Sequence, residues 1–234
     1  MRRTLILAAL GAMLLPALAL AESQSGPSGS SSSSSGSGIS ISNNVSGGGT
    51  VNQSISISGN QVENNGGAGI SISNSTTDGG SISQTVTAHD NTITGNGGAG
   101  ISVSNTNDGT GSISQTVTSH DNTITGNGGS GISVSNSNTG TGSITAGVSS
   151  TNDNISNNGG DGITATNEGS GSSLSVDLSG GGSQITDNTG AGVNAINNGD
   201  NNSLSINKPS AANLADNGAG PLTTSGTGTV VVIP

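Results

Sequence analysis

The 234-residue chain contains no cysteine and no Phe, Trp or Tyr. The lack of cysteine excludes disulfides, thiolate metal sites and cysteine nucleophiles. Only 27% of the residues are hydrophobic, which is low for ordinary globular packing. A layered globule around a wide aromatic core is therefore excluded.

Positively charged residues are also scarce, since the chain has three Lys or Arg residues against 13 Asp and Glu. Arg2 and Arg3 lie in an N-terminal segment that we expect to be removed. Lys208 is then the single Lys or Arg residue against 13 carboxylates, which gives a formal net charge of −12. Such a chain has no basic patch for nucleic acid or anionic lipid, so we expect neither as a partner.

Residues 1–21 have the pattern of a secretory signal peptide, with Arg2 and Arg3 ahead of the apolar residues 5–15. Ala19-Leu20-Ala21 offers a small-residue cleavage site. The apolar run is too short for a membrane span. We therefore expect secretion, to the extracellular space, cell surface or periplasm. Residues 22–37 are rich in Ser and Gly, which predicts a flexible linker.

The dominant feature is a repeat in which a glycine followed by Ile or Val recurs every 31 or 30 residues. A fixed period of this length indicates a stacked architecture, in which each unit buries its apolar side chains against the next. Six units are present, and their glycines are Gly38, Gly69, Gly100, Gly131, Gly162 and Gly192.

Each unit contains three short runs of β pattern. In the second unit, residues 69–73 and 81–87 alternate apolar and polar side chains, and residues 92–94 form a third run. Gly, Asn and Asp clusters between them are typical of turns. Three strands per period predict one triangular coil of an all-β parallel solenoid. We expect six to seven coils over residues 38–217, then a partial last coil or C-terminal capping strand over 218–234.

Aligning the units places like residues at equivalent positions. Stacked at the ~4.8 Å strand spacing, they fill a narrow core continuously. A low apolar content is then sufficient, because nearly every aliphatic side chain is buried. One expected aliphatic column contains Val51, Ile82, Ile113, Ile144, Leu174 and Leu204.

Polar columns accompany the aliphatic ones. Two asparagine columns are suited to turns, because stacked amides can satisfy one another and Asn tolerates left-handed backbone. A glutamine column has the inward phase of its strand and predicts a buried structural ladder. The asparagines are Asn43, Asn74, Asn105, Asn136, Asn167 and Asn197, and Asn65, Asn96, Asn127, Asn158, Asn188 and Asn217; the glutamines are Gln53, Gln84 and Gln115, followed by Ala146, Val176 and Ile206.

Residues 91–103 (NTITGNGGAGISV) and 122–134 resemble the N-x-I-x-x-N-x-x-x-G-I pattern of right-handed parallel β-helix repeat proteins. That superfamily includes pectate-lyase-like enzymes and many secreted surface proteins. The resemblance implies a right-handed coil. It is nearly silent on activity, because the matching residues are scaffold positions.

The sequence contains neither the residues of a calcium-binding β-roll motif nor those of a carbohydrate-cleaving β-helix. The glycines of residues 66–72 begin like a calcium-binding β-roll motif, but Ser71 stands where that motif has Asp. We read these glycines as turn residues. Polysaccharide-cleaving β-helices use carboxylates together with Arg, Lys or His, and no matching set is found. We therefore expect a non-enzymatic protein without a cofactor.

Two predicted turns contain titratable side chains that are candidates for binding a metal ion. His89-Asp90 and His120-Asp121 lie one unit apart, so stacking would place them on neighbouring coils. Imidazole and carboxylate are typical ligands of divalent metals, which makes these four residues candidates for a metal site. The simpler interpretation is a duplicated exposed turn, and we favour it.

Outward threonines form the remaining signal. Thr-x-Thr rows resemble the ice-binding faces of some β-solenoids, although ordinary β-propensity also explains them. They are candidates for surface recognition: Thr85, Thr87, Thr116, Thr118, Thr92, Thr94, Thr123 and Thr125.

The sequence favours a secreted, non-enzymatic solenoid that acts as an extracellular structural or adhesive module. The alternatives are a carbohydrate-binding or carbohydrate-active β-helix and an ice-binding protein. Contact with a cell surface or glycan is the expected interaction. We expect the apolar residues 230–233 to fold back as a capping strand or, alternatively, to pair with the open strand edge of another molecule in end-to-end self-association, and we favour the capping strand.

Overall fold

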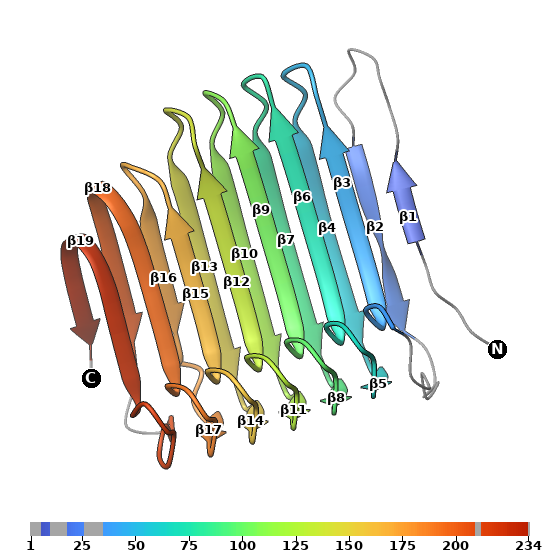
Figure 1. The fold of residues 1–234 in the computed structure, drawn as a ribbon, viewed down its shortest axis with the longest axis vertical. Helices are drawn as coiled ribbons and strands as arrows, with labels where there is room; N and C mark the ends of the chain where they lie inside the picture. The colour runs from blue at the N-terminus through green and yellow to red at the C-terminus, as the bar shows by residue number, and fades with distance from the viewer. Residues whose placement is uncertain (1–5, 10–17, 26–34, 209–211, 234) are drawn as a thin grey trace.

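The computed structural model describes residues 6–9, 18–25, 35–208 and 212–233. The described chain winds into a stack of parallel β coils (Figure 1). The first strand of each coil contributes to one broad wall, here called the first wall. Its strands are β3 (Ile39–Val45), β6 (Ile70–Thr77), β9 (Ile101–Asp108), β12 (Ile132–Asn138), β15 (Ile163–Glu168) and the first part of β18 (Val193–Asn207).

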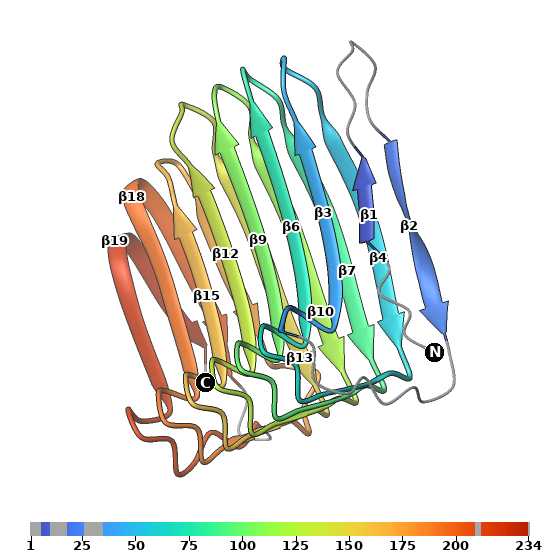
Figure 2. The ribbon, with the colours of Figure 1, turned by 45° about the vertical axis from the view of Figure 1, so that its right-hand side comes forward.

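A second wall faces the first (Figure 2), and a short wall lies along one end of both (Figure 1). The second wall consists of β4 (Val51–Ser58), β7 (Ile82–His89), β10 (Ile113–His120), β13 (Ile144–Thr151), β16 (Ser173–Asp177) and the last part of β18. The short wall consists of β5 (Gln61–Glu63), β8 (Thr92–Thr94), β11 (Thr123–Thr125), β14 (Asn154–Ser156) and β17 (Gln184–Thr186). The expected all-β solenoid with three strands per coil is confirmed.

The two broad walls have longer strands than the sequence pattern predicts, because strands such as β6 continue through polar residues to Thr77. Alternation still governs burial. In β7 the side chains of Ile82, Gln84 and Val86 are buried, whereas Ser83 and Thr85 are exposed. The inward aliphatic side chains form one continuous cluster that runs along the stack.

From the fifth coil onward, the register of the second wall differs from the aligned repeat. The alignment places Leu174 beside Ile144, but the structure pairs Leu174 with Ala146. This slip of two residues preserves the inward face of the strand. The turn before β16 is shorter, and the hydroxyl of buried Ser172 accepts a hydrogen bond from the Ile144 amide at 3.1 Å. The glutamine column therefore continues as Ala146, Leu174 and Leu204, while Val148 is followed by Val176 and Ile206.

Both asparagine columns form hydrogen-bonded ladders, but the column from Asn43 to Asn167 lies within the strands of the first wall and faces the core, not at turns as expected. In the turn ladder, from Asn65 to Asn217, the backbone amide of each Asn from Asn65 to Asn188 donates to the side-chain oxygen of the next. In the core ladder, Asn105 Nδ2 donates to Asn136 Oδ1 at 3.0 Å and across the core to Gln84 Oε1 at 2.9 Å. The expected glutamine ladder is present from Gln53 to Gln115. The two broad walls are thus joined through buried amides.

Several repeated glycines serve close packing between coils. A Cβ on Gly100 would lie 2.4 Å from Ile124 Cγ2, and one on Gly97 would lie 2.4 Å from the Gly66 carbonyl oxygen. Neither glycine has a positive φ. Reading these glycines only as turn residues is therefore incomplete, because contact with the neighbouring coil is what excludes a side chain.

Both ends of the stack carry additional strands. β1 (Ile6–Ala9) pairs with β3, and β2 (Leu18–Ser25) pairs with β4. β19 (Leu222–Ile233) pairs with β18 as a partial seventh coil. Much of the expected signal peptide (residues 1–21) and residues 26–34 of the expected linker (22–37) lie outside the described residues. Both assignments stay predictions.

Ile124 lies at the centre of the stack, with 0% exposure, between Ile93 and Ile155. We predict that Ile124→Asp unfolds the chain, because an unpaired carboxylate in this core finds no partner. Circular dichroism and thermal melting measure the loss. Thr116→Asp, on an exposed side chain of the same coil, should retain the β spectrum. A random-coil spectrum of the unmutated protein, with or without calcium, would contradict the fold.

Candidate functional site: hydroxyl rows and stacked turns

The predicted threonine rows lie side by side on the outside of the stack. On the second wall, Thr85 pairs with Thr116 and Thr87 with Thr118. On the short wall, Thr92 pairs with Thr123 and Thr94 with Thr125. Both arrays are interrupted at the next coil, where the paired residues include Gly147 on β13 and Asn154 on β14.

The first wall carries longer hydroxyl rows that the sequence analysis did not single out. Two outward serine rows cross β3, β6, β9 and β12 in register. Neighbouring serines of one row are ~4.8 Å apart, which is the spacing between strands. The two rows are about 6.6 Å apart along each strand. The signal was the repeated GISIS or GISVS motif, whose serines alternate with buried aliphatic residues. The rows contain Ser40, Ser71, Ser102 and Ser133, and Ser42, Ser73, Ser104 and Ser135.

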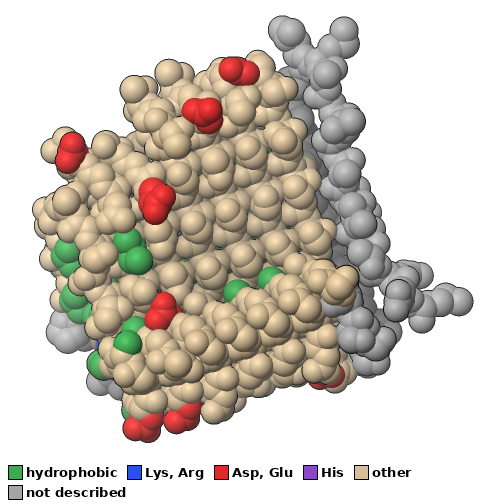
Figure 3. Space-filling model, in the orientation of Figure 1, with side chains coloured by type: hydrophobic (Ala, Val, Ile, Leu, Met, Phe, Trp, Pro, Cys, Tyr) green, Lys and Arg blue, Asp and Glu red, His purple; other side chains and the backbone are tan. Residues whose placement is uncertain are grey.

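Figure 3 views this first wall as a regular surface of small polar side chains. Its carboxylates lie toward the turns and the C-terminal coils, leaving the middle of the wall without charged side chains. The outward positions of β6, β9 and β12 are half-buried or exposed, as a flat surface requires. The arrangement provides a two-dimensional lattice of hydroxyl donors and acceptors.

The two His-Asp turns are stacked as predicted. The imidazole rings of His89 and His120 are parallel within 2° and their centroids are 4.8 Å apart. Each Nδ1 lies within hydrogen-bond distance of the following carboxylate, at 2.8 Å to Asp90 and 3.0 Å to Asp121. The hydrogen bond with His120 is the main cause that lowers the pKa of Asp121. Asp90 and Asp121 have φ of 55° and 57°, the left-handed backbone of a turn.

This stack is poorly arranged to hold a metal ion. Parallel rings direct their ring-nitrogen lone pairs side by side, whereas imidazole ligands must converge on an ion about 2.0–2.1 Å away. Within the described ranges, no group of three or more His, Asp or Glu side chains could hold a metal ion. The geometry therefore favours a duplicated turn.

Asp153 is a buried titratable group that the sequence analysis missed. It is 1% exposed and ends a third ladder, formed by Asn60, Asn91 and Asn122. Its Oδ1 accepts hydrogen bonds from the backbone amide and side chain of Asn122, and its Oδ2 accepts one of 2.6 Å from Ser150 Oγ. Burial raises the pKa of Asp153, and these hydrogen bonds offset part of the increase. The available signal was an Asp at a position where the three preceding coils have Asn60, Asn91 and Asn122.

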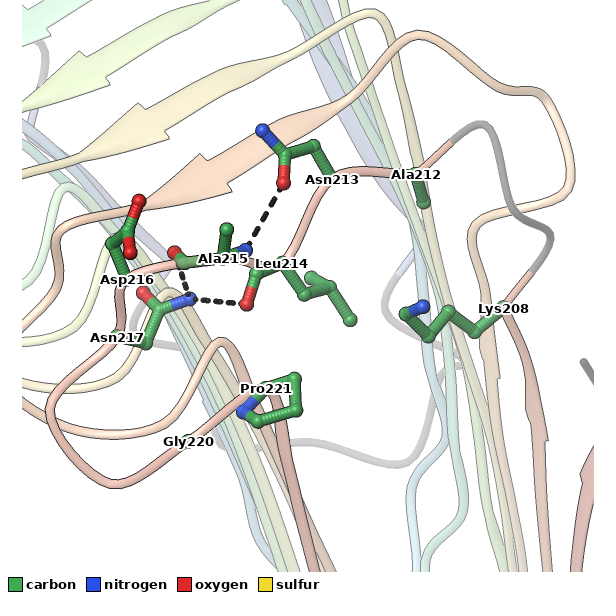
Figure 4. A pocket seen from close by; sticks show the side chains of 9 residues that line it. All are labelled: Lys208, Ala212, Asn213, Leu214, Ala215, Asp216, Asn217, Gly220 and Pro221. Carbon is green, nitrogen blue, oxygen red and sulfur yellow. Dashed lines mark hydrogen bonds between the residues drawn. The ribbon is translucent and has the colours of Figure 1, made fainter.

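A cavity of about 490 Å³ opens at the C-terminal end of the stack (Figure 4). Asn217 Nδ2 donates to the carbonyl oxygens of Leu214 and Ala215 beside it, at 3.0 and 3.1 Å. Lys208 and Pro221 approach it from other sides (Figure 4). Its lining combines small and apolar side chains with two charged ones, Lys208 and Asp216.

We predict that Asp153→Asn raises the melting temperature at pH 7, because it removes the cost of burying an ionised carboxylate. A raised folded-state pKa means that the ionised form destabilises the fold. This penalty is absent where the carboxyl is protonated in both states and grows as pH rises through the folded-state pKa. The gain from Asp153→Asn should therefore shrink as pH falls from neutral toward about 4, the ordinary pKa of an unfolded Asp carboxyl, and be absent below it. Melting temperatures across pH test this, with exposed Asp200→Asn as the control; a pH-independent gain would contradict it.

The stacked histidines yield a second expectation. His89→Ala together with His120→Ala should change the free energy of unfolding by no more than about 0.5 kcal/mol, because both side chains lie at the surface. Thermal melting measures this. Should the unmutated protein cleave a glycan and the double variant fail to, the pair would be catalytic and the duplicated-turn interpretation wrong.

The described part of the chain holds no helix long and apolar enough to cross a membrane. Comparisons with curated proteins and with solved structures found no match. A family model described as "Right handed beta helix region" matches residues 22–146, more than half of the sequence. The match covers the coils whose serine and threonine rows form the flat surfaces. The chain belongs to the family of right-handed β-helix proteins.

Proposed function

We propose that this protein is a secreted, non-enzymatic structural or adhesive module that contacts surfaces through its flat hydroxyl rows. The observation that carries the proposal is the first wall, where two serine rows cross four successive strands in register. A lattice of this kind complements a surface that itself repeats hydroxyl groups, such as a solid neutral polysaccharide.

Rigidity supports this role. Amide ladders fix the spacing of the coils from within, so the outer hydroxyl groups are held in place before contact. Each hydrogen bond exchanged with water contributes only about 0.5–1.5 kcal/mol. Many such bonds made together by a pre-organised face can still retain a particle, because little ordering entropy is lost on contact.

Charge also favours a neutral partner. The carboxylates lie around the turns and the later coils, so close contact with the middle of the first wall does not require a carboxylate to be desolvated. An acidic polymer would meet the net negative field of the whole protein. A neutral, repetitive polyhydroxyl solid is the partner that these features favour.

Ice binding is the second candidate, because Thr85, Thr87, Thr116 and Thr118 form a paired array on the second wall. That array is smaller than the serine lattice of the first wall. The carbohydrate-cleaving alternative has less support, since the stacked His-Asp turns lie on an exposed edge and each carboxylate is bonded to its own histidine.

We predict that Ser104→Lys with Ser135→Lys weakens retention on particulate cellulose or chitin about tenfold, or about 1.4 kcal/mol. Both residues point outward from neighbouring strands, so the lysines interrupt the lattice without entering the core. Co-sedimentation with washed particles measures retention. Thr110→Lys with Thr141→Lys, on exposed turns, adds the same charge away from the wall and should not weaken binding.

The two candidate functions give different results in one panel. Thermal hysteresis that is lost in Thr116→Lys with Thr118→Lys, without retention on particles, would replace adhesion with ice binding. Equal loss in the wall and turn variants, or no retention of the unmutated protein, would contradict the hydroxyl lattice as the adhesive surface.

A further inference from the structure

The C-terminal end of the stack presents a strand edge that contains no charged residue and no proline. β19 pairs with β18 on one side, and no described strand pairs with its other edge. Natural edge strands are commonly guarded by charges or proline. β19 contains neither, and Val230, Val231, Val232 and Ile233 are 44–47% exposed.

Half of these exposed side chains continue the core of the stack. Val230 lies beside buried Leu204, and Val232 lies beside buried Ile206. They therefore have the inward phase, yet the next layer that would bury them is not supplied by the described chain. Val231 and Ile233 have the opposite, outward phase.

The N-terminal end shows how such a layer can be added. The outer edges of β3 and β4 accept β1 and β2, both in parallel orientation. Ile39 and Ile41 of β3 are partly buried against the core. Both strands lie in the segment where we expect signal-peptide cleavage after Ala21, which would remove β1 and the first half of β2 and uncover these edges.

We propose that β19 of one molecule takes the place of β1 and β2 on a second copy, so that processed molecules stack head to tail. The direction of β19 agrees with this, since it is parallel to β18 as β1 is to β3. Continuing the register of the walls places Leu222 beside Ile39 of the second copy, and Val232 beside its Ile55. Each new contact then repeats the spacing found within the stack.

Charge does not oppose the contact locally. β19, β3 and β4 contain no charged residue, and Glu63 is the single charged residue of the first coil. The remaining carboxylates repel over longer distances, which salt screens within about 10 Å at 0.1 M. The cavity beside Leu214 and Pro221 occupies the third side at this end, so the two broad walls make the contact (Figure 4).

The two ends of the molecule differ, so the contact is heterologous and does not close on itself. Repetition yields a filament in which the hydroxyl rows recur in every molecule and are interrupted at Asn194 and Ile196 of β18. The inference deepens the proposed structural module, because a filament multiplies the surface available for contact.

Three proteins test the polarity of this contact: residues 22–234, the full chain, and residues 22–234 carrying Val230→Asp with Val232→Asp. The buried core runs from Val51 to Leu214 and is therefore contained in residues 22–234. Circular dichroism of each protein first establishes that it folds. Sedimentation velocity at rising protein and salt concentrations then measures association.

We expect residues 22–234 to form a concentration-dependent series of oligomers. The full chain should remain monomeric because β1 and β2 cover one end, and the Val230→Asp, Val232→Asp variant should remain monomeric because its other end would bury carboxylates. Mixing these two monomers leaves one compatible pair of ends, so they should form a one-to-one dimer. The matched control, Val231→Asp with Ile233→Asp, carries the same charges on outward positions and should still polymerise.

A strict monomer for residues 22–234, no dimer in the mixture, or equal loss in both aspartate variants would each overturn the head-to-tail contact. Retention on polysaccharide particles is measured separately on the monomeric variant. Adhesion without polymerisation would therefore reject this inference alone, whereas polymerisation without adhesion would reject the hydroxyl-wall proposal and leave the filament.

Discussion

The structure depends on one constraint: each core residue must lie beside its equivalent in the next coil. Asn105 shows how strictly this is imposed, because its side-chain amide donates both to Asn136 along the first wall and to Gln84 across the core. An amide has two N–H donors, and both are committed here. A slip of either wall would leave buried donors without acceptors, at about 1–3 kcal/mol each. Register along the stack and register between the walls are therefore fixed by the same atoms.

The position where the register changes supports this explanation. The glutamine column ends at Gln115, and from the fifth coil the inward position of the second wall is occupied by Leu174. Asn167 then donates to the Ser173 carbonyl, and Asn197 to the Ser203 carbonyl, instead of to a glutamine. Without an amide that joins the walls, the second wall can shift by two residues and still bury its aliphatic face. The shorter turn before β16 accompanies this change.

The sequence predicted the fold well because the period is carried by the residues that stack. Equal spacing was sufficient to identify the aliphatic column of Ile82 and Ile113, the buried glutamines and both asparagine columns. Leu174 was placed incorrectly because the shorter turn before β16 is offset by a longer turn after it, between Asp177 and Gln184. The length of the repeat therefore hardly changes, and an alignment by repeat length does not detect the shift. The pairing of Asn105 with Gln84 could not be predicted either, since it joins different strands through the core. Asp153 could not be recognised as a buried group, because burial is not visible in one position of a polar column.

The serine rows carry more information about function than the threonine rows do. Thr is common in strands, so β-propensity alone accounts for Thr85 or Thr116. Serine has no such preference, yet it occupies eight outward positions over four strands of the first wall. The inner side of each strand is constrained by stacking, whereas the outer side faces solvent and can vary without affecting the core. On the second wall the outer side does vary, with Ser54, Thr85, Thr116 and Gly147 at paired positions. The two serine rows of β3, β6, β9 and β12 give way to Thr164 and Thr166 on β15 and to Asn194 and Ile196 on β18. Small hydroxyl groups therefore keep the part of the first wall from β3 to β12 flat, and this is the part that the proposed surface contact uses.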